Sequence, residues 1–252
     1  MDMSHHQKDL WTVTFRVFRQ KGNAAGHYDT FKLEVNPDEY VIDAVERIWA
    51  YHDRTLAFAH ACHHSTCGAC GMRVNGVEKL TCITPIHTVA KNGGITQVDP
   101  LRNFPVVSDL VVDMGSLYQR MEQVGHRPVL PLPEEPAGLP VRKNNGNEYV
   151  RLSDCIECGL CISACPVALS TPGYIGPAVL AGALQHGIKA APALLALVDS
   201  EDGVWRCHSA FECTKACPSY VEPGTKIMQL RKQVVGERCQ PLPIESMTWR
   251  LK

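Results

Sequence analysis

Alternating polar and apolar positions mark two strands near the start of the chain. Residues 11–18 read WTVTFRVF and residues 28–35 read YDTFKLEV, and this alternation is typical of half-buried strands. Residues that favour turns lie between the two runs, namely Gly22, Asn23 and Gly26. The pattern therefore predicts a β-hairpin.

A stretch with the residue spacing of a helix follows the predicted hairpin along the chain. After Pro37, apolar residues recur at helical intervals up to Tyr51, which predicts a helix that packs across the sheet. Residues 72–82 then contain two short strand-like pieces around an Asn-Gly pair at 75–76, and residues 93–101 read as a final strand. We therefore expect a small mixed β-sheet with one crossing helix over roughly the first hundred residues.

The second half of the chain has a different pattern. Residues 108–124, 176–188 and 223–235 are helix candidates, and the last two open with glycine or proline. Residues 127–140 contain five prolines, which favour an extended segment. We place the domain boundary near residue 110, which gives one α+β domain over residues 1–110 and one helical domain over residues 111–252.

Composition narrows the possible functions. The chain has 252 residues, of which 45% are hydrophobic, so it is long enough to bury real cores. Lys plus Arg number 25 against 26 for Asp plus Glu. This balance leaves no positive surplus for a phosphate backbone, so nucleic-acid binding is not expected.

The unusual feature is the presence of twelve cysteines. The first residues, MDMSHHQKDLWTV, lack the apolar run of a signal peptide. An oxidising compartment is therefore not implied, and thiolates stay available for metal, so we expect a cytosolic metalloprotein. The most apolar stretch, residues 178–198, is interrupted by Gln185, His186, Lys189 and Pro192, so we do not expect it to form a transmembrane helix.

Four cysteines in the first half have the spacing C-x4-C-x2-C-x11-C, and they are Cys62, Cys67, Cys70 and Cys82. The first three match the plant-type [2Fe-2S] spacing, which also uses a more distant fourth cysteine. Small residues at Gly68, Ala69 and Gly71 leave room for backbone N–H groups to approach the sulfides. A structural zinc site and plain buried thiols are the alternatives. His63 and His64 raise the question of a Rieske centre, but with four cysteines present we expect both to be non-ligands.

Two further cysteine groups follow in the second half. Cys155, Cys158, Cys161 and Cys165, followed by Pro166, form the bacterial ferredoxin run, whose fourth cysteine ligates the other cluster of a pair. The partner run has Cys207, Cys213 and Cys217 followed by Pro218. Ala210 stands where the partner run would have its middle cysteine, so one ligand is missing.

In such a pair, the last cysteine of each run ligates the cluster held by the other run. This exchange divides the seven cysteines into two sets. Cys155, Cys158, Cys161 and Cys217 can hold a complete [4Fe-4S] cluster. Cys165, Cys207 and Cys213 remain for the other site, which predicts a [3Fe-4S] cluster with the Ala210 methyl group in the corner of the missing iron. The alternatives are a fourth iron bound by water, Ser209 or Glu212, and zinc or disulfides at these cysteines. Cys239 lies outside every motif.

Three clusters in one chain suggest a path for single electrons. No GxGxxG loop, P-loop or GxSxG motif accompanies the cysteines, so the sites of the electron donor and acceptor are expected mostly on partners. The motifs CHHSTCGACGMRVNG, CIECGLCISACP and CHSAFECTKACP, in this order over about residues 10–240, resemble the iron–sulfur subunit of succinate dehydrogenase/fumarate reductase.

The resemblance implies a fold, cofactors and partners. It implies an N-terminal β-grasp domain of the plant-type ferredoxin kind and an all-helical domain of the bacterial ferredoxin kind. It also implies a flavoprotein subunit whose covalent FAD interconverts succinate and fumarate. Electrons would pass by way of [2Fe-2S], [4Fe-4S] and [3Fe-4S] clusters to a quinone at one or two membrane-anchor subunits, with this chain held at the cytoplasmic face of the inner membrane.

The resemblance also implies roles for individual residues of this chain. The resemblance places the first four cysteines on the flavoprotein side, and Pro166 and His208 near the quinone. Ser170 stands where some members have a tryptophan near the quinone, and Arg231 falls near a basic residue of the anchor interface. The Arg and Gly often found after the first cysteine are replaced here by His63 and Ser65, which alters the surroundings of the [2Fe-2S] centre.

Three other functions remain open at this point. One is a related electron-transfer subunit of a thiol-linked fumarate reductase or of a heterodisulfide or glycolate oxidoreductase. Another is a free ferredoxin-type carrier without a fixed partner. The third is a non-redox zinc scaffold, which predicts a colourless protein.

Overall fold

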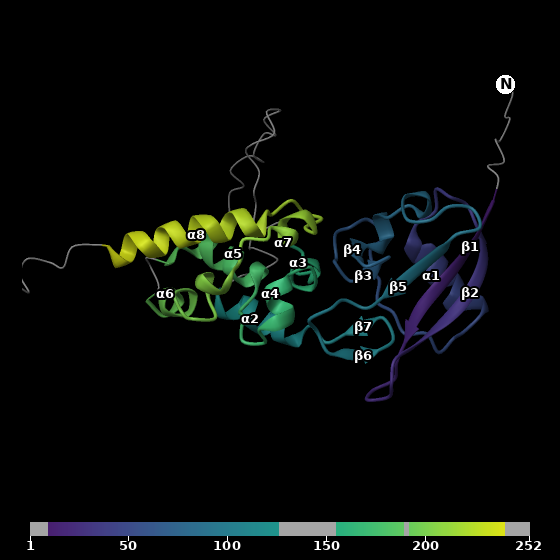
Figure 1. Ribbon diagram of the computed structural model, residues 1–252, viewed down its shortest axis with the longest axis horizontal. Helices are drawn as coiled ribbons and strands as arrows, with labels where there is room; N and C mark the ends of the chain where they lie inside the picture. Colours follow the sequence, from purple (N-terminus) through teal and green to yellow (C-terminus); the bar gives the residue numbers. More distant parts are fainter. Residues whose placement is uncertain (1–9, 126–154, 189–191, 240–252) are drawn as a thin grey trace, which may run out of the picture.

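The computed structural model describes residues 10–125, 155–188 and 192–239 (Figure 1). The proline-rich segment 127–140 lies outside these residues. A β-sheet occupies one end of the elongated molecule and a group of helices occupies the other (Figure 1). Among the described residues, no helix is both long enough and apolar enough to cross a bilayer.

The N-terminal half is built on a five-stranded mixed sheet with the strand order β2-β1-β5-β3-β4. Its strands are β1 (Trp11–Arg19), β2 (His27–Val35), β3 (Gly71–Val74), β4 (Val77–Leu80) and β5 (Ile95–Asp99). β1 runs parallel to β5 and antiparallel to β2, with Phe15 opposite Phe31. The predicted hairpins and the final strand are therefore confirmed.

One face of this sheet is covered by helix α1 (Val41–Tyr51). Val13, Phe15 and Val17 of β1 are fully buried, because alternate residues of a strand point to the same face. α1 begins later than Pro37 because residues 36–39 form a turn in which Asn36 accepts the N–H of Asp38 at 3.1 Å. The Asp43 carboxylate then caps the N–H of Tyr40 at 2.9 Å. Two short 3-10 turns, η1 (Thr81–Ile83) and η2 (Ile86–Thr88), follow β4.

The helix predicted over residues 108–124 is wrong in its first part. The chain instead forms a two-stranded ribbon of β6 (Val106–Ser108) and β7 (Val111–Val112), and α2 covers only Gly115–Gln123. The reason lies in Asp109, which is fully buried. Its carboxylate accepts N–H groups of Gln20 and Ala57 at 2.9 and 2.8 Å and pairs with Arg19 at 3.2 Å. A continuous helix could not place this side chain in the core.

Helices and 3-10 turns make up the regular structure that is described beyond residue 155. They are α3 (Leu160–Ser163), α4 (Pro166–Ser170), α5 (Pro177–His186), α6 (Pro192–Val198), η5 (Val204–Arg206), α7 (Glu212–Lys215) and α8 (Pro223–Arg238). The predicted helices near 176–188 and 223–235 are thus confirmed. Ile227, Leu230 and Val234 of α8 are fully buried, and α8 lies alongside α5 (Figure 1).

The two halves share one hydrophobic core and a polar seam. Ser163 is fully buried; its hydroxyl donates to Glu78 at 2.9 Å and accepts the N–H of Arg102 at 2.9 Å. The Asn103 amide donates to the carbonyl oxygen of Ile162 at 2.7 Å. Helix α3, which carries Cys161, is therefore bonded directly to the strand half.

Candidate iron–sulfur centres

The first cysteine group lies on the loop between α1 and β3 and on η1. The thiols are brought together in pairs, because Cys62 hydrogen-bonds Cys67 and Cys82 hydrogen-bonds Cys70. Cys70 and Cys82 are buried, whereas Cys67 is exposed. The group thus has a buried side toward the sheet and an open side toward the surface.

The backbone of this loop points donors at sulfur. His64 and Thr66 donate their N–H groups to Cys62 Sγ at 3.5 and 3.3 Å. This geometry depends on left-handed backbone at His63 and Ser65, with φ of 56° and 58°. Thr66 and these N–H groups lower the pKa of Cys62 to about 5, which favours the thiolate that binds metal.

A second set of thiols lines a small apolar cavity: Cys155, Cys158, Cys161 and Cys217. Ala178, Ala181 and Val221 close its walls. Burial, together with the neighbouring thiolates, raises the pKa of Cys155 to about 11 and that of Cys158 to about 12. Four thiolates crowded into apolar surroundings need a positive partner, and iron ions supply it. The residues therefore fit a cluster at this position.

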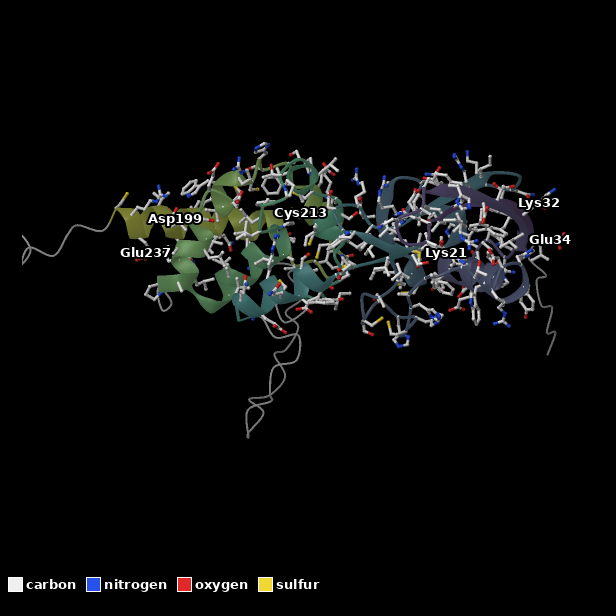
Figure 2. The ribbon with its side chains drawn as sticks, turned by 90° about the horizontal axis from the view of Figure 1, so that it is seen from below. Lys21, Lys32, Glu34, Asp199, Cys213 and Glu237 are labelled. Atoms are coloured by element: carbon white, nitrogen blue, oxygen red, sulfur yellow. The ribbon has the colours of Figure 1, made fainter. Side chains whose placement is uncertain are left out.

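The remaining three thiols, Cys165, Cys207 and Cys213, line another cavity. Cys213 is labelled within the helical half in Figure 2. Burial, with the neighbouring Cys165 and Cys207, raises the pKa of Cys213 to about 11. Ala210 lies on the wall of this cavity and offers no ligand atom. The structure thus divides the seven cysteines of the second half into a set of four and a set of three.

The alternatives for the three-cysteine cavity can be compared with its geometry. Ser209 and Glu212 both line it, but each side chain already has a partner. Ser209 lies 3.4 Å from Arg231 Nη1, and Glu212 accepts from Lys215 at 2.7 Å. All twelve cysteines are described and none forms a disulfide.

Only some of the residues predicted to lie near the quinone are close together in the structure. Pro166 and His208 are exposed and lie together on the wall of the three-cysteine cavity. Ser170 ends α4, where its hydroxyl donates to the carbonyl oxygen of Val167 at 3.2 Å. It is not among the residues that line the cavity.

Arg231 takes a different position from the others. From α8 its guanidinium donates to the carbonyl oxygen of Val204 at 2.9 and 2.7 Å, and to that of Cys207. Arg231 thus fixes the backbone of the loop that carries Cys207. Its contact with a membrane anchor stays a prediction.

Tyr174 is a site residue that sequence reasoning missed. It is 3% exposed, lines the three-cysteine cavity, and hydrogen-bonds Cys207. Burial raises its pKa, so the hydroxyl stays protonated and donates to sulfur. A tyrosine between Gly173 and Ile175 gives no signal of this role in the sequence.

Comparisons with known proteins agree with this geometry. A family model for a 2Fe-2S iron-sulfur cluster binding domain matches residues 14–119, and one for a 4Fe-4S dicluster domain matches residues 151–221. The fumarate reductase iron-sulfur subunit of Mycobacterium tuberculosis (strain CDC 1551 / Oshkosh) is 31% identical over 225 residues, which cover 85% of this chain and 88% of that protein. The chain belongs to the family of succinate dehydrogenase/fumarate reductase iron–sulfur subunits.

A mitochondrial relative and a solved structure are also similar to this chain. The mitochondrial succinate dehydrogenase [ubiquinone] iron-sulfur subunit of Candida glabrata is 29% identical, over 88% of this chain and 90% of that protein. A chain of the Mycobacterium smegmatis Sdh1 complex in the apo form aligns with a TM-score of 0.73 at 25% identity, covering 93% of this chain and all of that one. This succinate dehydrogenase/fumarate reductase iron–sulfur subunit is therefore an electron-transfer subunit of an oxidoreductase complex, with [2Fe-2S] and [4Fe-4S] domains as predicted.

Proposed function

We propose that this subunit carries electrons between the FAD of a flavoprotein subunit and a quinone at a membrane anchor, by way of [2Fe-2S], [4Fe-4S] and [3Fe-4S] clusters. The proposal rests on the position of Cys217, the last cysteine of the second run. It lies with the three cysteines of the earlier run, while Cys165 lies with Cys207 and Cys213. This exchange is what paired ferredoxin clusters need.

The ligand assignment follows from the three groups. Cys62, Cys67, Cys70 and Cys82 would hold the [2Fe-2S] cluster, and Cys155, Cys158, Cys161 and Cys217 the [4Fe-4S] cluster. Cys165, Cys207 and Cys213 would hold the [3Fe-4S] cluster. Ala210 keeps the last site short of a fourth ligand, and Tyr174 and Arg231 hold the Cys207 loop in place.

The quinone would approach the exposed side of the three-cysteine cavity. Pro166, His208 and Phe211 lie at its wall, and α4 and η5 carry further exposed apolar side chains. Leu169, Trp205 and Phe211 are 63%, 40% and 38% exposed. Such residues suit burial against a membrane-anchor subunit. Attachment at the cytoplasmic face of the inner membrane is part of the same proposal.

The finer fold description is also proposed. The sheet order β2-β1-β5-β3-β4 with α1 across one face supports a β-grasp domain of the plant-type ferredoxin kind. The helices after residue 155 support an all-helical domain of the bacterial ferredoxin kind. The domain division near residue 110 would fall within the β6–β7 ribbon.

The test is electron paramagnetic resonance of the chain purified anaerobically with its partners. The oxidised complex should show a [3Fe-4S]⁺ signal, and the reduced complex a separate [2Fe-2S]⁺ signal. Succinate should produce the reduced signal, and fumarate should remove it. A colourless protein that contains zinc, or a complex whose clusters respond to neither compound, would contradict the proposal. A free carrier would elute as an isolated chain with intact clusters.

A further inference from the structure

Two histidines and one glutamate converge beside the first cysteine group. Glu46 lies on α1, and His60 and His63 lie on the loop that leads through Cys62. Glu46 Oε1 is 3.1 Å from His60 Nδ1 and 3.2 Å from His63 Nε2. The two ring nitrogens are themselves 3.1 Å apart. Three potential ligand atoms thus form a nearly equilateral triangle.

Hydrogen bonds cannot satisfy all three contacts of this triangle at the same time. An ionised carboxylate only accepts hydrogen bonds, and each ring nitrogen either donates or accepts. If both nitrogens donate to Glu46, their N–H groups oppose each other across 3.1 Å. If one nitrogen accepts from the other, its lone pair is turned toward that N–H group, and it has no proton to donate to Glu46. A cation in the centre is attracted to all three atoms at once.

The distances match a metal site. Two ligand atoms that are each about 2.1 Å from a metal, at about 90–110° to one another, lie about 3.0–3.4 Å apart. The observed separations of 3.1 to 3.2 Å fall in this range. Two imidazoles and one carboxylate, with further positions open to water, are typical of divalent first-row transition metals.

The surroundings hold the three ligands in place. Phe58 stacks on His60 with ring centroids 5.3 Å apart and planes at 10°, and Trp49 packs edge-on against Phe58 at 6.4 Å. The backbone of His63, at φ 56°, is fixed by the loop in which the N–H groups of His64 and Thr66 donate to Cys62 Sγ. Glu46 Oε1 is buried without a hydrogen-bond donor of good geometry. The two imidazole nitrogens lie 3.1 and 3.2 Å from this oxygen.

We infer that Glu46, His60 and His63 form a binding site for a divalent transition metal such as Zn²⁺. The site is distinct from the cysteine groups, although His63 is the residue after Cys62. Bound metal would join α1 to the cysteine loop and place a positive charge next to that loop. The inference does not rest on the proposed function, since it needs only the fold of the N-terminal half.

Zn²⁺ titration of the full chain tests the site. The chain is purified anaerobically with its clusters, treated with a chelator, and titrated in a calorimeter. Bound zinc and iron are then counted by mass spectrometry. Cys239→Ser is the background, because Cys239 is an exposed thiol. We expect one equivalent of Zn²⁺ per chain, with no loss of iron.

Variants locate the metal. Glu46→Gln and His60→Ala should each weaken Zn²⁺ binding by more than the roughly 10–100-fold typical of changes in the outer shell of a metal site. His64→Ala is the matched control, because His64 is exposed and outside the triangle. It should keep the full equivalent. Unchanged iron content and thermal midpoint show that the variants fold.

Co²⁺ gives an independent readout. Its unpaired electrons should speed the spin relaxation of the reduced [2Fe-2S]⁺ signal, whereas diamagnetic Zn²⁺ at the same occupancy should not. The effect should be lost in His63→Ala. Failure of the wild-type chain to retain Zn²⁺, or equal binding by the triangle variants and His64→Ala, would overturn the inference. Either result would leave the electron-transfer proposal intact.

Discussion

Gly68 lies so close to Cys158 that a methyl group on Gly68 would stand 2.9 Å from the Cβ atom of that cysteine. The same methyl group would lie 2.8 Å from the carbonyl oxygen of Ile156. The loop of the first cysteine group is therefore pressed against the loop of the second. Because nothing larger than glycine fits, the contact fixes how near the first two centres can come.

Gly68→Ala should force these two loops apart. Gly68 has φ of +72°, so backbone strain adds to the clash, and we expect a loss of about 1–3 kcal/mol of stability. The spin–spin interaction between the reduced [2Fe-2S] and [4Fe-4S] clusters should weaken in the paramagnetic resonance spectrum. Gly93→Ala is the matched control, since Gly93 has φ of +77° but nothing within 4 Å. An equal effect in both variants would show that strain alone matters.

Ala210→Cys should complete the ligand set of the three-cysteine cavity. Its side chain lies on the wall beside Cys207 and Cys213, so a fourth thiolate there favours a cube. We expect the oxidised [3Fe-4S]⁺ signal to disappear, iron to rise by one atom per chain and quinone reduction to slow. Ala210→Val adds bulk without a ligand and should keep the signal. An unchanged spectrum in Ala210→Cys would count against the assignment.

Tyr174→Phe should lower the reduction potential of the cluster at the three-cysteine cavity. The lost hydroxyl donates to Cys207, and hydrogen bonds to ligand sulfur stabilise the reduced state. A redox titration followed by paramagnetic resonance measures the shift. Tyr220→Phe is the control, because Tyr220 is 80% exposed. A potential that does not move, or that moves equally in both variants, would remove Tyr174 from this role.

Arg19→Met should be among the most destabilising single changes in the N-terminal half. It would leave Asp109, whose side chain is 1% exposed, without the guanidinium that lies 3.2 Å away. Breaking a buried pair in this way costs about 3–5 kcal/mol. The double variant Arg19→Met with Asp109→Asn should recover part of the loss. Thermal unfolding measures both, and the absence of recovery would mean that packing of Arg19, and not charge, is what matters.

Asp53 gives a pH test of the same cluster of charges. The hydrogen bond from Arg19 at 2.5 Å holds the pKa of Asp53 well below its usual range. The pKa of this carboxyl is lower in the folded state than the value of about 3.9 in the unfolded chain, so ionised Asp53 stabilises the fold. This stabilisation is fully present above the unfolded pKa and is lost as the pH falls through the folded pKa. Asp53→Asn should therefore lower the melting temperature equally at pH 5.5 and pH 8.

A control and a contrary result are available for Asp53. Glu201→Gln removes a carboxylate that is 87% exposed and pairs with Arg206 at the surface, so its effect should be small at every pH. A destabilisation by Asp53→Asn that shrinks between pH 8 and pH 5.5 would contradict the depressed pKa.

Local patterns predicted the parts of the fold that depend on local physics. The alternation in β1 and β2 and the spacing of α5 and α8 reflect which residues face the core. The division of the cysteines into sets also followed from spacing, because ligands of one cluster must lie near one another along the chain or in paired runs.

Features that depend on contacts between distant segments could not be predicted. Asp109 breaks the expected helix through partners at Gln20 and Ala57, and no local pattern reveals such partners. Tyr174 reaches Cys207 in the same way. The approach of His60 to Glu46 also depends on how a loop returns to a helix.

The polar seam at Ser163 and Asn103 has a consequence for how quickly electrons can move within the molecule. Because α3 is bonded to the strand half and both halves share one core, the described residues around the first and second centres are packed together as one unit. We therefore expect that domain motion does not gate electron transfer between them. Its rate constant should be the same in dilute buffer and in viscous glycerol, in contrast to carriers that swing a mobile domain between donor and acceptor.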